Sequence, residues 1–583
     1  MPSLEEKIKS TDALVTVIGV GYIGLPLAVR YAELGFDVLG VDANPDRVNS
    51  LEKAQSLSPS ILREDLKRLL KENRLRFSKT ESLDDRFDET DIFIVCVPTP
   101  LKENYGWQPD LQYIEQACAN VKEALKKHMG DNEKLIILES TTYPGTTDEI
   151  FGKVVKEFAE TNKGQLVYLA YSPERVSPGT EDFRKGFDMT RVVGGYEGSA
   201  LEDRNYKDAT LAKEFYRHAY PKVKVVSSTA AAEMTKLYEN TFRFASIAFA
   251  NEMARVARAF DLNIWEIVDA AMTKPYGTGM TNPGLIGGHC IPIDPHYLHW
   301  ATRARRQDIP FIGISENAHQ EMHREASHLI TRAFVNSGGK PICQSKILFL
   351  GIAYKEDVPD IRESGALKLI KILQQLGPVI EYWDPVYSKQ YTKENEGDRP
   401  IYIGFTNHEH IKLPDYIKDN TNGNGIDRNP IEEMEGAGEK GDFPGTARRW
   451  ALRILPIVAE TSEWDDIKKI LEEGRYDCVV IATNHEEFSS FYTHFLFDQN
   501  RKFPVVDLRN ALTSWVHKIC NYNEKGGNEE AKKLMLKLDK EYPGITGTGG
   551  EDLQEQCKNF KKNAKKNIRK RRKEKLYFLL GRD

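Results

Sequence analysis

The sequence predicts an α/β protein in which two doubly wound parallel-sheet domains are joined by a long central helix. In the first and last parts of the chain, short apolar runs rich in β-branched residues alternate with helical patterns, as in parallel sheets. Between them, residues 228–260 contain neither Gly nor Pro and keep a helical spacing of apolar residues over about thirty positions. That is much longer than an average helix.

Successive strand–helix units are expected to build each domain. The apolar runs of the first domain predict strands at 13–20, 36–42, 91–98, 134–140 and 165–173, with a helix over 25–35. Those of the second predict strands at 346–354, 379–385, 477–484 and 503–510, with a helix over 365–377. The chain then divides into a first α/β domain (1–215), a central helical region (216–330), a second α/β domain (331–520) and a charged basic tail (521–583).

Two stretches do not fit a compact domain. Residues 418–446 are rich in Gly, Asn and Glu and predict a disordered loop within an insertion over about 394–460. Residues 558–575 hold eleven Lys or Arg and one Glu, so this basic tail carries about +10 while the net charge is −6. Basic runs attract phosphates, but only Phe560 interrupts this one as an aromatic. The sequence therefore does not favour nucleic acid as a partner.

Composition excludes several classes of protein. The 583 residues are 40% hydrophobic and 29% charged, which is typical of a globular protein with real cores. The sequence has no run of eighteen apolar residues, so no membrane span is expected, and its start does not resemble a secretory signal. The seven cysteines are scattered without a CxxC pair. This favours a reducing, cytoplasmic location, with no structural zinc or other metal site.

A glycine-rich turn follows the first expected strand and opens a helix, with the sequence Gly19-Val20-Gly21-Tyr22-Ile23-Gly24. In a dinucleotide-binding Rossmann fold, such glycines permit a tight turn and a close approach to the pyrophosphate, which binds at the helix N-terminus. Asp42 ends the second strand, where an acid accepts hydrogen bonds from ribose and favours NAD over NADP, although Arg47 is nearby. The alternative is a glycine turn without a ligand.

The loop over 283–295 places Cys290 after two glycines and Asp294 four residues later. A thiol in a polar, glycine-lined loop can act as a nucleophile, whereas Cys96 and Cys478 lie in apolar strand runs and are expected in the core. On the long helix, Lys236 and Asn240 are four residues apart and so share a face. Spacing alone leaves open that this face is simply solvated.

Taken together, these segments resemble the UDP-glucose/GDP-mannose dehydrogenase family from about residue 12 to 515. The stretches that carry the resemblance are VIGVGYIGLPLA, VCVPTPL, LESTTYPGTT, YSPERVSPG, RVVGG, AEMTKLYENTFR, NPGLIGGHCIPIDP, LGIAYKEDVPDIRES, VVIATNHEEF and VVDLRN. The resemblance implies an N-terminal NAD domain, a central helical domain that forms a homodimer or higher oligomer, and a UDP-sugar-binding domain. It also implies an alcohol-to-acid oxidation that consumes two NAD⁺ per sugar.

The resemblance assigns roles to individual residues. It implies that Cys290 attacks the C6 aldehyde, and that the resulting thiohemiacetal becomes a thioester that water hydrolyses. Lys236 matches a lysine that stabilises the developing alkoxide, Asn240 an oxyanion donor, Asp294 an acid that holds water, and Glu174 a glutamate implicated in thioester hydrolysis. The expected cofactor-binding residues are Gly19, Gly21, Tyr22, Ile23, Gly24, Asp42, Arg47, Thr142 and Arg362, and the expected UDP-sugar-binding residues are Lys355 and Arg509.

The substrate is expected to be UDP-N-acetylglucosamine, because the versions YSPERVSPG and NPGLIGGHCIPIDPHYL look most like the branch of the family that acts on it. UDP-glucose is the alternative sugar. Two further alternatives are a two-electron hydroxyacid dehydrogenase, which would need no cysteine, and a non-catalytic NAD-binding protein whose basic tail binds an anionic partner.

Overall fold

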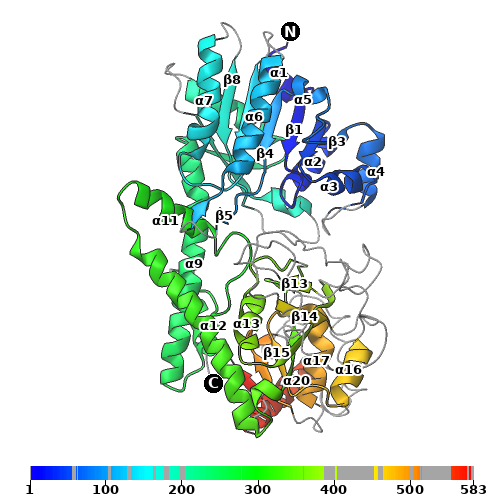
Figure 1. Cartoon of the computed structure of the whole chain (residues 1–583), viewed down its shortest axis with the longest axis vertical. Coiled ribbons are helices and arrows are strands. Elements are labelled where there is room, and N and C mark those ends of the chain that lie inside the picture. Colours follow the sequence, from blue (N-terminus) through cyan, green and yellow to red (C-terminus); the bar gives the residue numbers. More distant parts are fainter. Residues whose placement is uncertain are drawn as a thin grey trace, which may run out of the picture. The chain divides into compact units, whose positions relative to one another are not determined.

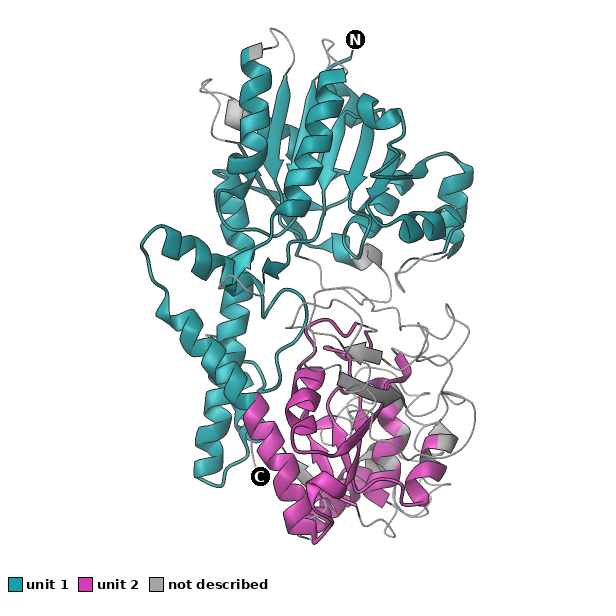
Figure 2. Ribbon diagram, in the orientation of Figure 1, with its two compact units in different colours: residues 1–322 teal, residues 323–583 magenta. Residues whose placement is uncertain are grey.

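The computed structural model divides into two compact units, residues 1–322 and 323–583, which Figure 2 colours separately. The structure describes residues 2–55, 61, 63–102, 107–127, 133–161, 166–175, 183–196, 204–276, 279–358, 360–386, 401–403, 452–456, 464–497, 503–511, 514, 553–573 and 577–579. Within these ranges, no helix is both long enough and apolar enough to cross a membrane.

The first unit contains an eight-stranded sheet with the order β10-β9-β8-β7-β4-β1-β2-β3. Figure 1 labels β1, β3, β4 and β8 of this sheet. Its strands are β1 (Leu14–Ile18), β2 (Asp37–Asp42), β3 (Leu75–Lys79), β4 (Ile92–Val95), β7 (Lys134–Leu138), β8 (Val167–Tyr171), β9 (Thr190–Gly195) and β10 (Lys222–Val226). Neighbouring strands are parallel, except that β8 and β9 pair antiparallel. The sheet grows in opposite directions from β1, so a ligand crevice is expected outside the carboxyl ends of β1 and β4.

Helices connect these strands, as parallel pairing requires. They are α1 (Leu4–Ser10), α2 (Gly24–Glu33), α3 (Pro45–Glu52), α4 (Arg63–Lys71), α5 (Arg86–Glu89), α6 (Gln112–Lys127), α7 (Thr146–Thr161), α8 (Arg204–Arg217) and the short 3₁₀ helix η1 (Phe183–Asp188). A small antiparallel hairpin, β5 (Leu101–Lys102) and β6 (Gln108–Pro109), follows β4. The β1 sequence LVTVI and the β7 sequence KLIIL are buried almost throughout, as inner strands of a covered sheet must be.

The predicted central helix is α9 (Thr229–Ala259), and it agrees with the expected range to within one residue at each end. It begins at Ser228, whose side chain accepts a hydrogen bond from the Ala231 N–H at 3.1 Å, an N-cap that satisfies an otherwise free donor. The helices that follow are α10 (Ile264–Met272), α11 (Asp294–Ala304) and α12 (Pro310–Ser337). The chain passes from the first unit into the second within α12.

The second unit contains a seven-stranded sheet with the order β13-β14-β12-β11-β15-β16-β17. Its strands are β11 (Lys346–Leu350), β12 (Val379–Trp383), β13 (Ile401–Ile403), β14 (Leu452–Pro456), β15 (Cys478–Ile481), β16 (Val505–Asp507) and β17 (Tyr577–Leu579). The helices are η2 (Ile342–Gln344), α13 (Gly365–Gln374), α16 (Trp464–Glu472), η4 (Glu486–Phe488), α17 (Ser489–Phe497) and α20 (Leu553–Lys573). The predicted fold class, two parallel-sheet domains and a long central helix, is therefore confirmed.

Part of the predicted tail over 521–583 is described as α20 and β17, and both belong to the second unit. α20 packs through Phe560 and Ala564 into the core of the second unit, and β17 pairs in parallel with β16. The basic run forms an amphipathic helix, in which Phe560, Ala564 and the cation Arg571 are buried while Lys562, Lys565 and Lys566 are exposed. Within the expected insertion, 394–460, β13 and β14 are described strands, while residues 418–446 lie outside the described residues. The expected central division at 216–330 stays a prediction.

Candidate active site

The turn after β1 requires glycine at two positions for steric reasons. Gly19 has φ +93°, and a Cβ there would lie 2.5 Å from the carbonyl oxygen of Cys96. A Cβ at Gly24 would lie 1.9 Å from the Gly19 carbonyl oxygen. At Gly21, by contrast, a Cβ would meet nothing within 4 Å. The fold thus explains Gly19 and Gly24, while the open space at Gly21 suits the close approach of a ligand.

The start of α2 offers N–H donors to an anion. Ile23 occupies the N-cap position, and its apolar side chain makes no hydrogen bond to the first turn of the helix. A helix N-terminus of this kind binds phosphate groups through its N–H groups and its dipole. Tyr22 lies in the same turn. These features fit the pyrophosphate of a dinucleotide.

Asp42, at the end of β2, is held by three donors. Its carboxylate accepts hydrogen bonds from the backbone N–H groups of Val20 at 3.0 Å and Asn44 at 2.9 Å, and from Arg47 Nη1 at 2.9 Å. A carboxylate offers about four lone-pair sites. Asp42 therefore keeps acceptor capacity for a ribose hydroxyl beside the glycine turn, and the residues present fit NAD.

Asp294, the first residue of α11, is buried beside two residues of α9. Asn240 Nδ2 donates a hydrogen bond to Asp294 Oδ2 at 2.5 Å. Burial raises the pKa of Asp294 from its ordinary 3.8 to about 6, although the charge of Lys236 and the hydrogen bond from Asn240 oppose the rise. An acid with a pKa in this range can exchange protons near neutral pH.

Cys290 lies in the turn that leads into α11 and is partly exposed. Its carbonyl oxygen accepts hydrogen bonds from the N–H groups of Ile293 at 3.0 Å and Asp294 at 2.8 Å. Gly288, two residues earlier, has φ +89°, a conformation that glycine adopts at little cost. The backbone therefore fixes the cysteine and the acid within one turn. Cys478 is fully buried, as predicted for a core residue.

Lys236 connects this turn to the end of β8. Its Nζ donates a hydrogen bond to the backbone carbonyl oxygen of Glu174 at 2.5 Å, and both residues are largely buried. The carboxylate of Glu174 accepts hydrogen bonds from the Arg175 N–H at 2.7 Å and from Arg191 Nη1 at 2.7 Å. These contacts connect Glu174, Lys236, Asn240, Asp294 and Cys290, so the structure places all five predicted catalytic residues in one region of the first unit.

Thr142 is buried in the loop between β7 and α7, near the start of α9. Glu233 of α9 accepts hydrogen bonds from the backbone N–H groups of Gly145 at 2.5 Å and Thr147 at 2.9 Å, and from Thr147 Oγ1 at 2.6 Å. The sequence analysis missed this residue. The sequence signal for Glu233 was a carboxylate on the long helix, one turn before Lys236. In the structure this carboxylate connects α9 to the loop that contains Thr142.

The remaining predicted residues belong to the second unit. Lys355 lies in the loop after β11, and the side chain of Arg362 forms an ion pair with Asp360 at 2.6 Å. The backbone N–H of Arg509 donates to Asp507 Oδ1 at 3.0 Å, and burial lowers the pKa of its guanidinium. Lys355 and Arg362 lie between the end of β11 and the start of α13, and Arg509 lies just after β16. The loops at the carboxyl ends of strands are where α/β sheets bind ligands.

Comparison with known proteins matches three descriptions of one family along the chain. Residues 13–219 match the NAD binding domain of the UDP-glucose/GDP-mannose dehydrogenase family, residues 230–320 its central domain and residues 348–423 its UDP binding domain.

Individual relatives agree with this match. The UDP-N-acetyl-D-mannosamine dehydrogenase of Pyrococcus horikoshii is 34% identical over 64% of this chain and 83% of its own. The UDP-N-acetyl-D-glucosamine 6-dehydrogenase of Pseudomonas aeruginosa is 30% identical over 67% of this chain and 87% of its own. A solved structure of a UDP-D-ManNAc dehydrogenase from Pyrococcus horikoshii superposes with a TM-score of 0.61 at 28% identity, covering 85% of this chain and 96% of the other.

Proposed function

Because the chain belongs to the UDP-glucose/GDP-mannose dehydrogenase family, we propose that it oxidises the C6 hydroxyl of a UDP-N-acetylhexosamine to the carboxylate. It is an NAD-dependent nucleotide-sugar dehydrogenase with a UDP-sugar-binding domain. The observation that carries the covalent route is the grouping of Cys290 with the hydrogen-bonded pair of Asp294 and Asn240, beside Lys236.

In the first oxidation, the C6 hydroxyl loses its proton and a hydride to become an aldehyde. The Lys236 ammonium and the Asn240 amide would stabilise the negative charge that develops on the C6 oxygen, because both donors are already held in place. The buried Asp294 carboxylate would hold a water molecule that receives the proton. NAD⁺, when bound, supplies the hydride acceptor for both oxidations.

In the second oxidation, the Cys290 thiolate would add to the aldehyde carbon to form a thiohemiacetal, whose loss of a hydride leaves a thioester. Water then attacks the thioester carbon, and one of its protons passes to Glu174. The C–S bond breaks to release the Cys290 thiolate and the carboxylic acid, which loses its remaining proton to solvent to become the uronate. Gly19, Gly21, Tyr22, Ile23, Gly24, Asp42, Arg47 and Thr142 would hold NAD, and the cofactor-binding role of Arg362 stays a prediction from the sequence. Lys355 and Arg509 of the second unit would bind the UDP-sugar.

UDP-N-acetyl-D-mannosamine is the proposed sugar. The sequence predicted UDP-N-acetylglucosamine, but the relatives that act on UDP-N-acetyl-D-mannosamine are slightly more similar, at 34% against 30% identity. The test is the total NADH formed from a limiting amount of each sugar nucleotide with excess NAD⁺. Two NADH per UDP-N-acetyl-D-mannosamine would support the proposal. One would mean that the reaction stops after two electrons, and a faster reaction with UDP-N-acetylglucosamine or UDP-glucose would correct the sugar.

The rate should fall in acid because Asp294 must be ionised to hold water as a base. Its burial raises the pKa to about 6, so the carboxylate is lost as the pH falls through that value. We expect kcat/KM for the UDP-sugar to drop about tenfold per pH unit below roughly 6, since this ratio reports ionisations of the free enzyme. In the variant Asp294→Asn this acid limb should disappear along with most of the rate, and an unchanged limb would exclude Asp294 as its origin.

Self-association through α9 is also proposed. Three aromatic residues along this helix are largely exposed in the single chain, namely Tyr238 at 66%, Phe242 at 56% and Phe249 at 65%. A row of large apolar side chains of this kind commonly marks an interface between protein chains. The expected homodimer would give about twice the 66.4 kDa chain mass in light scattering, and a monomer would exclude it.

A further inference from the structure

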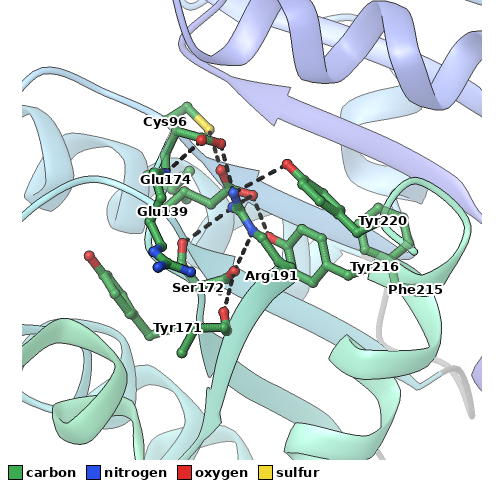
Figure 3. A network of polar contacts seen from close by, with 12 residues as sticks. Cys96, Glu139, Tyr171, Ser172, Glu174, Arg191, Phe215, Tyr216 and Tyr220 are labelled. Carbon is green, nitrogen blue, oxygen red and sulfur yellow. Dashed lines mark hydrogen bonds and ion pairs between the residues drawn. The ribbon is translucent and has the colours of Figure 1, made fainter. Parts of the chain in front are cut away.

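One buried arginine forms ion pairs with two carboxylates, one of which belongs to the proposed catalytic residue Glu174 (Figure 3). Arg191 of β9 is 1% exposed; its Nη2 lies 2.7 Å from Glu139 Oε1 and its Nη1 lies 2.7 Å from Glu174 Oε2. Glu139 directly follows β7 and is fully buried. Removing charges from water is costly unless they are paired and hydrogen-bonded, so an arrangement of two acids on one cation calls for an explanation.

The surroundings of the arginine are shaped to hold it. Its Nε donates to Ser172 Oγ at 2.7 Å, and its guanidinium lies 4.8 Å from the ring centroid of Tyr216 and 5.1 Å from that of Tyr220. The Tyr216 hydroxyl also donates a hydrogen bond to Glu139. Both acids, the arginine and the two tyrosine rings therefore form one contiguous network, as Figure 3 shows.

Sharing the cation has a chemical consequence for both acids. Burial raises the pKa of Glu139; Arg191 opposes this rise, and the negative charge of Glu174 adds to it. The same repulsion acts in the other direction, because the two carboxylates compete for one positive charge. If Arg191 paired with Glu174 alone, it would stabilise the Glu174 anion more strongly and make it a weaker base.

We propose that Glu139 is a positioning residue that, by sharing Arg191, keeps the Glu174 carboxylate basic enough to accept the proton of the hydrolytic water. This inference rests on the proposed function, in which water attacks the thioester. In that step the water oxygen forms a bond to the thioester carbon, the water proton moves to Glu174, and the Cys290 sulfur leaves with the electrons of the C–S bond. Arg191 stays neutralised by Glu139 after Glu174 has become neutral.

The ionisable groups around Glu174 come from several elements. They are Arg191 of β9, Glu139 after β7, Cys96 after β4, Lys236 and Glu239 of α9, Tyr216 of α8, Tyr220 before β10, and the adjacent Arg175, which pairs with Glu239 at 2.5 Å. Among these groups, Glu139 is the carboxylate that contacts the same guanidinium as Glu174. Its replacement therefore removes one of the two negative charges paired with Arg191 and leaves every proposed catalytic residue in place.

The test follows the covalent adduct on Cys290 directly. Full-length enzyme in excess is mixed with UDP-N-acetyl-D-mannosamine and NAD⁺, samples are quenched in acid, and intact mass gives the rate constant of adduct decay at each pH. In Glu139→Gln, the plateau of this rate constant should fall about three- to tenfold and its acid limb should move about one to two pH units lower. The matched control is Glu133→Gln, which removes a carboxylate at the other end of β7. It should behave as wild type.

The possible outcomes are distinct. Slower decay with an unmoved acid limb would mean that Glu139 acts only through structure, and wild-type decay in Glu139→Gln would mean that it has no role; either result overturns the inference. A wild-type enzyme that oxidises the sugar but forms no adduct would instead overturn the covalent function on which the inference rests. If Glu139→Gln does not fold, Tyr216→Phe keeps the ring and removes the hydrogen bond to Glu139. Glu139 then pairs more strongly with Arg191, so the acid limb should move higher, and a lower or unmoved limb would contradict the proposal.

Discussion

Replacing Cys290 with Ser is expected to lower uronate formation on the order of 10³-fold or more, because the covalent route loses its nucleophile. A serine hydroxyl is far less acidic than a thiol and is a poor nucleophile without an adjacent base. The change is nearly isosteric and lies in the turn before α11, in a different segment of the chain from the glycine turn after β1. NAD binding, measured by titration of intrinsic fluorescence, should therefore stay within about twofold of wild type.

The matched control for this variant is Cys343→Ser. Cys343 is an exposed free cysteine of the second unit, so its replacement should leave the rate of NADH formation unchanged. Undiminished turnover in Cys290→Ser would contradict the covalent mechanism. A fall of equal size in both variants would point instead to a general sensitivity of the enzyme to thiol loss.

Ending the chain after residue 552 should leave the second unit unable to fold stably. The truncation removes α20 and β17 and with them three residues of the core, Phe560, Ala564 and Tyr577. It also removes the hydrogen bond that the Tyr577 hydroxyl donates to Asp507 Oδ2 at 2.8 Å, and it exposes β16 as a new edge. The single change Phe560→Ala should already cost about 3–5 kcal/mol of unfolding free energy.

Urea unfolding followed by circular dichroism measures this loss. On the same helix, Lys566→Ala is the control, because this exposed lysine should contribute within about 0.5 kcal/mol. A truncated chain as stable as the full one would show that α20 and β17 are not part of the domain. The residues after 552 would then be a separate tail.

The sequence was informative where one physical signal dominated. Apolar β-branched runs located inner strands such as β1, β4, β7 and β15, and the absence of Gly and Pro located α9. The edge strand β10, with the sequence KVKVV, was missed because its residues are mostly exposed and two of its five residues are lysines. In α20 the apolar residues Phe560 and Ala564 are surrounded in the sequence by many cations, so the sequence pattern did not indicate a buried face.

The candidate site residues also differed in whether the sequence alone could predict them. Asp42 and the glycine turn were predictable from local chemistry, because their roles depend on residues that are close to them in the sequence. Arg191 and Glu139 were not, since their meaning depends on a contact between two strands that are far apart in sequence. A signal was nevertheless present in both: a charged residue at the end of an apolar strand run needs a buried partner.

The pairing of β17 with β16 also bears on how the protein is made. Asp507 and its partner Tyr577 are separated by 70 residues, so the ribosome must synthesise that stretch before this side of the second sheet can be covered. At about 5–20 residues per second, the edge of β16 stays open for several seconds during synthesis. Over that interval the nascent domain would offer an unpaired strand to other chains. The first unit, whose sheet is completed by β10, can already fold in that time.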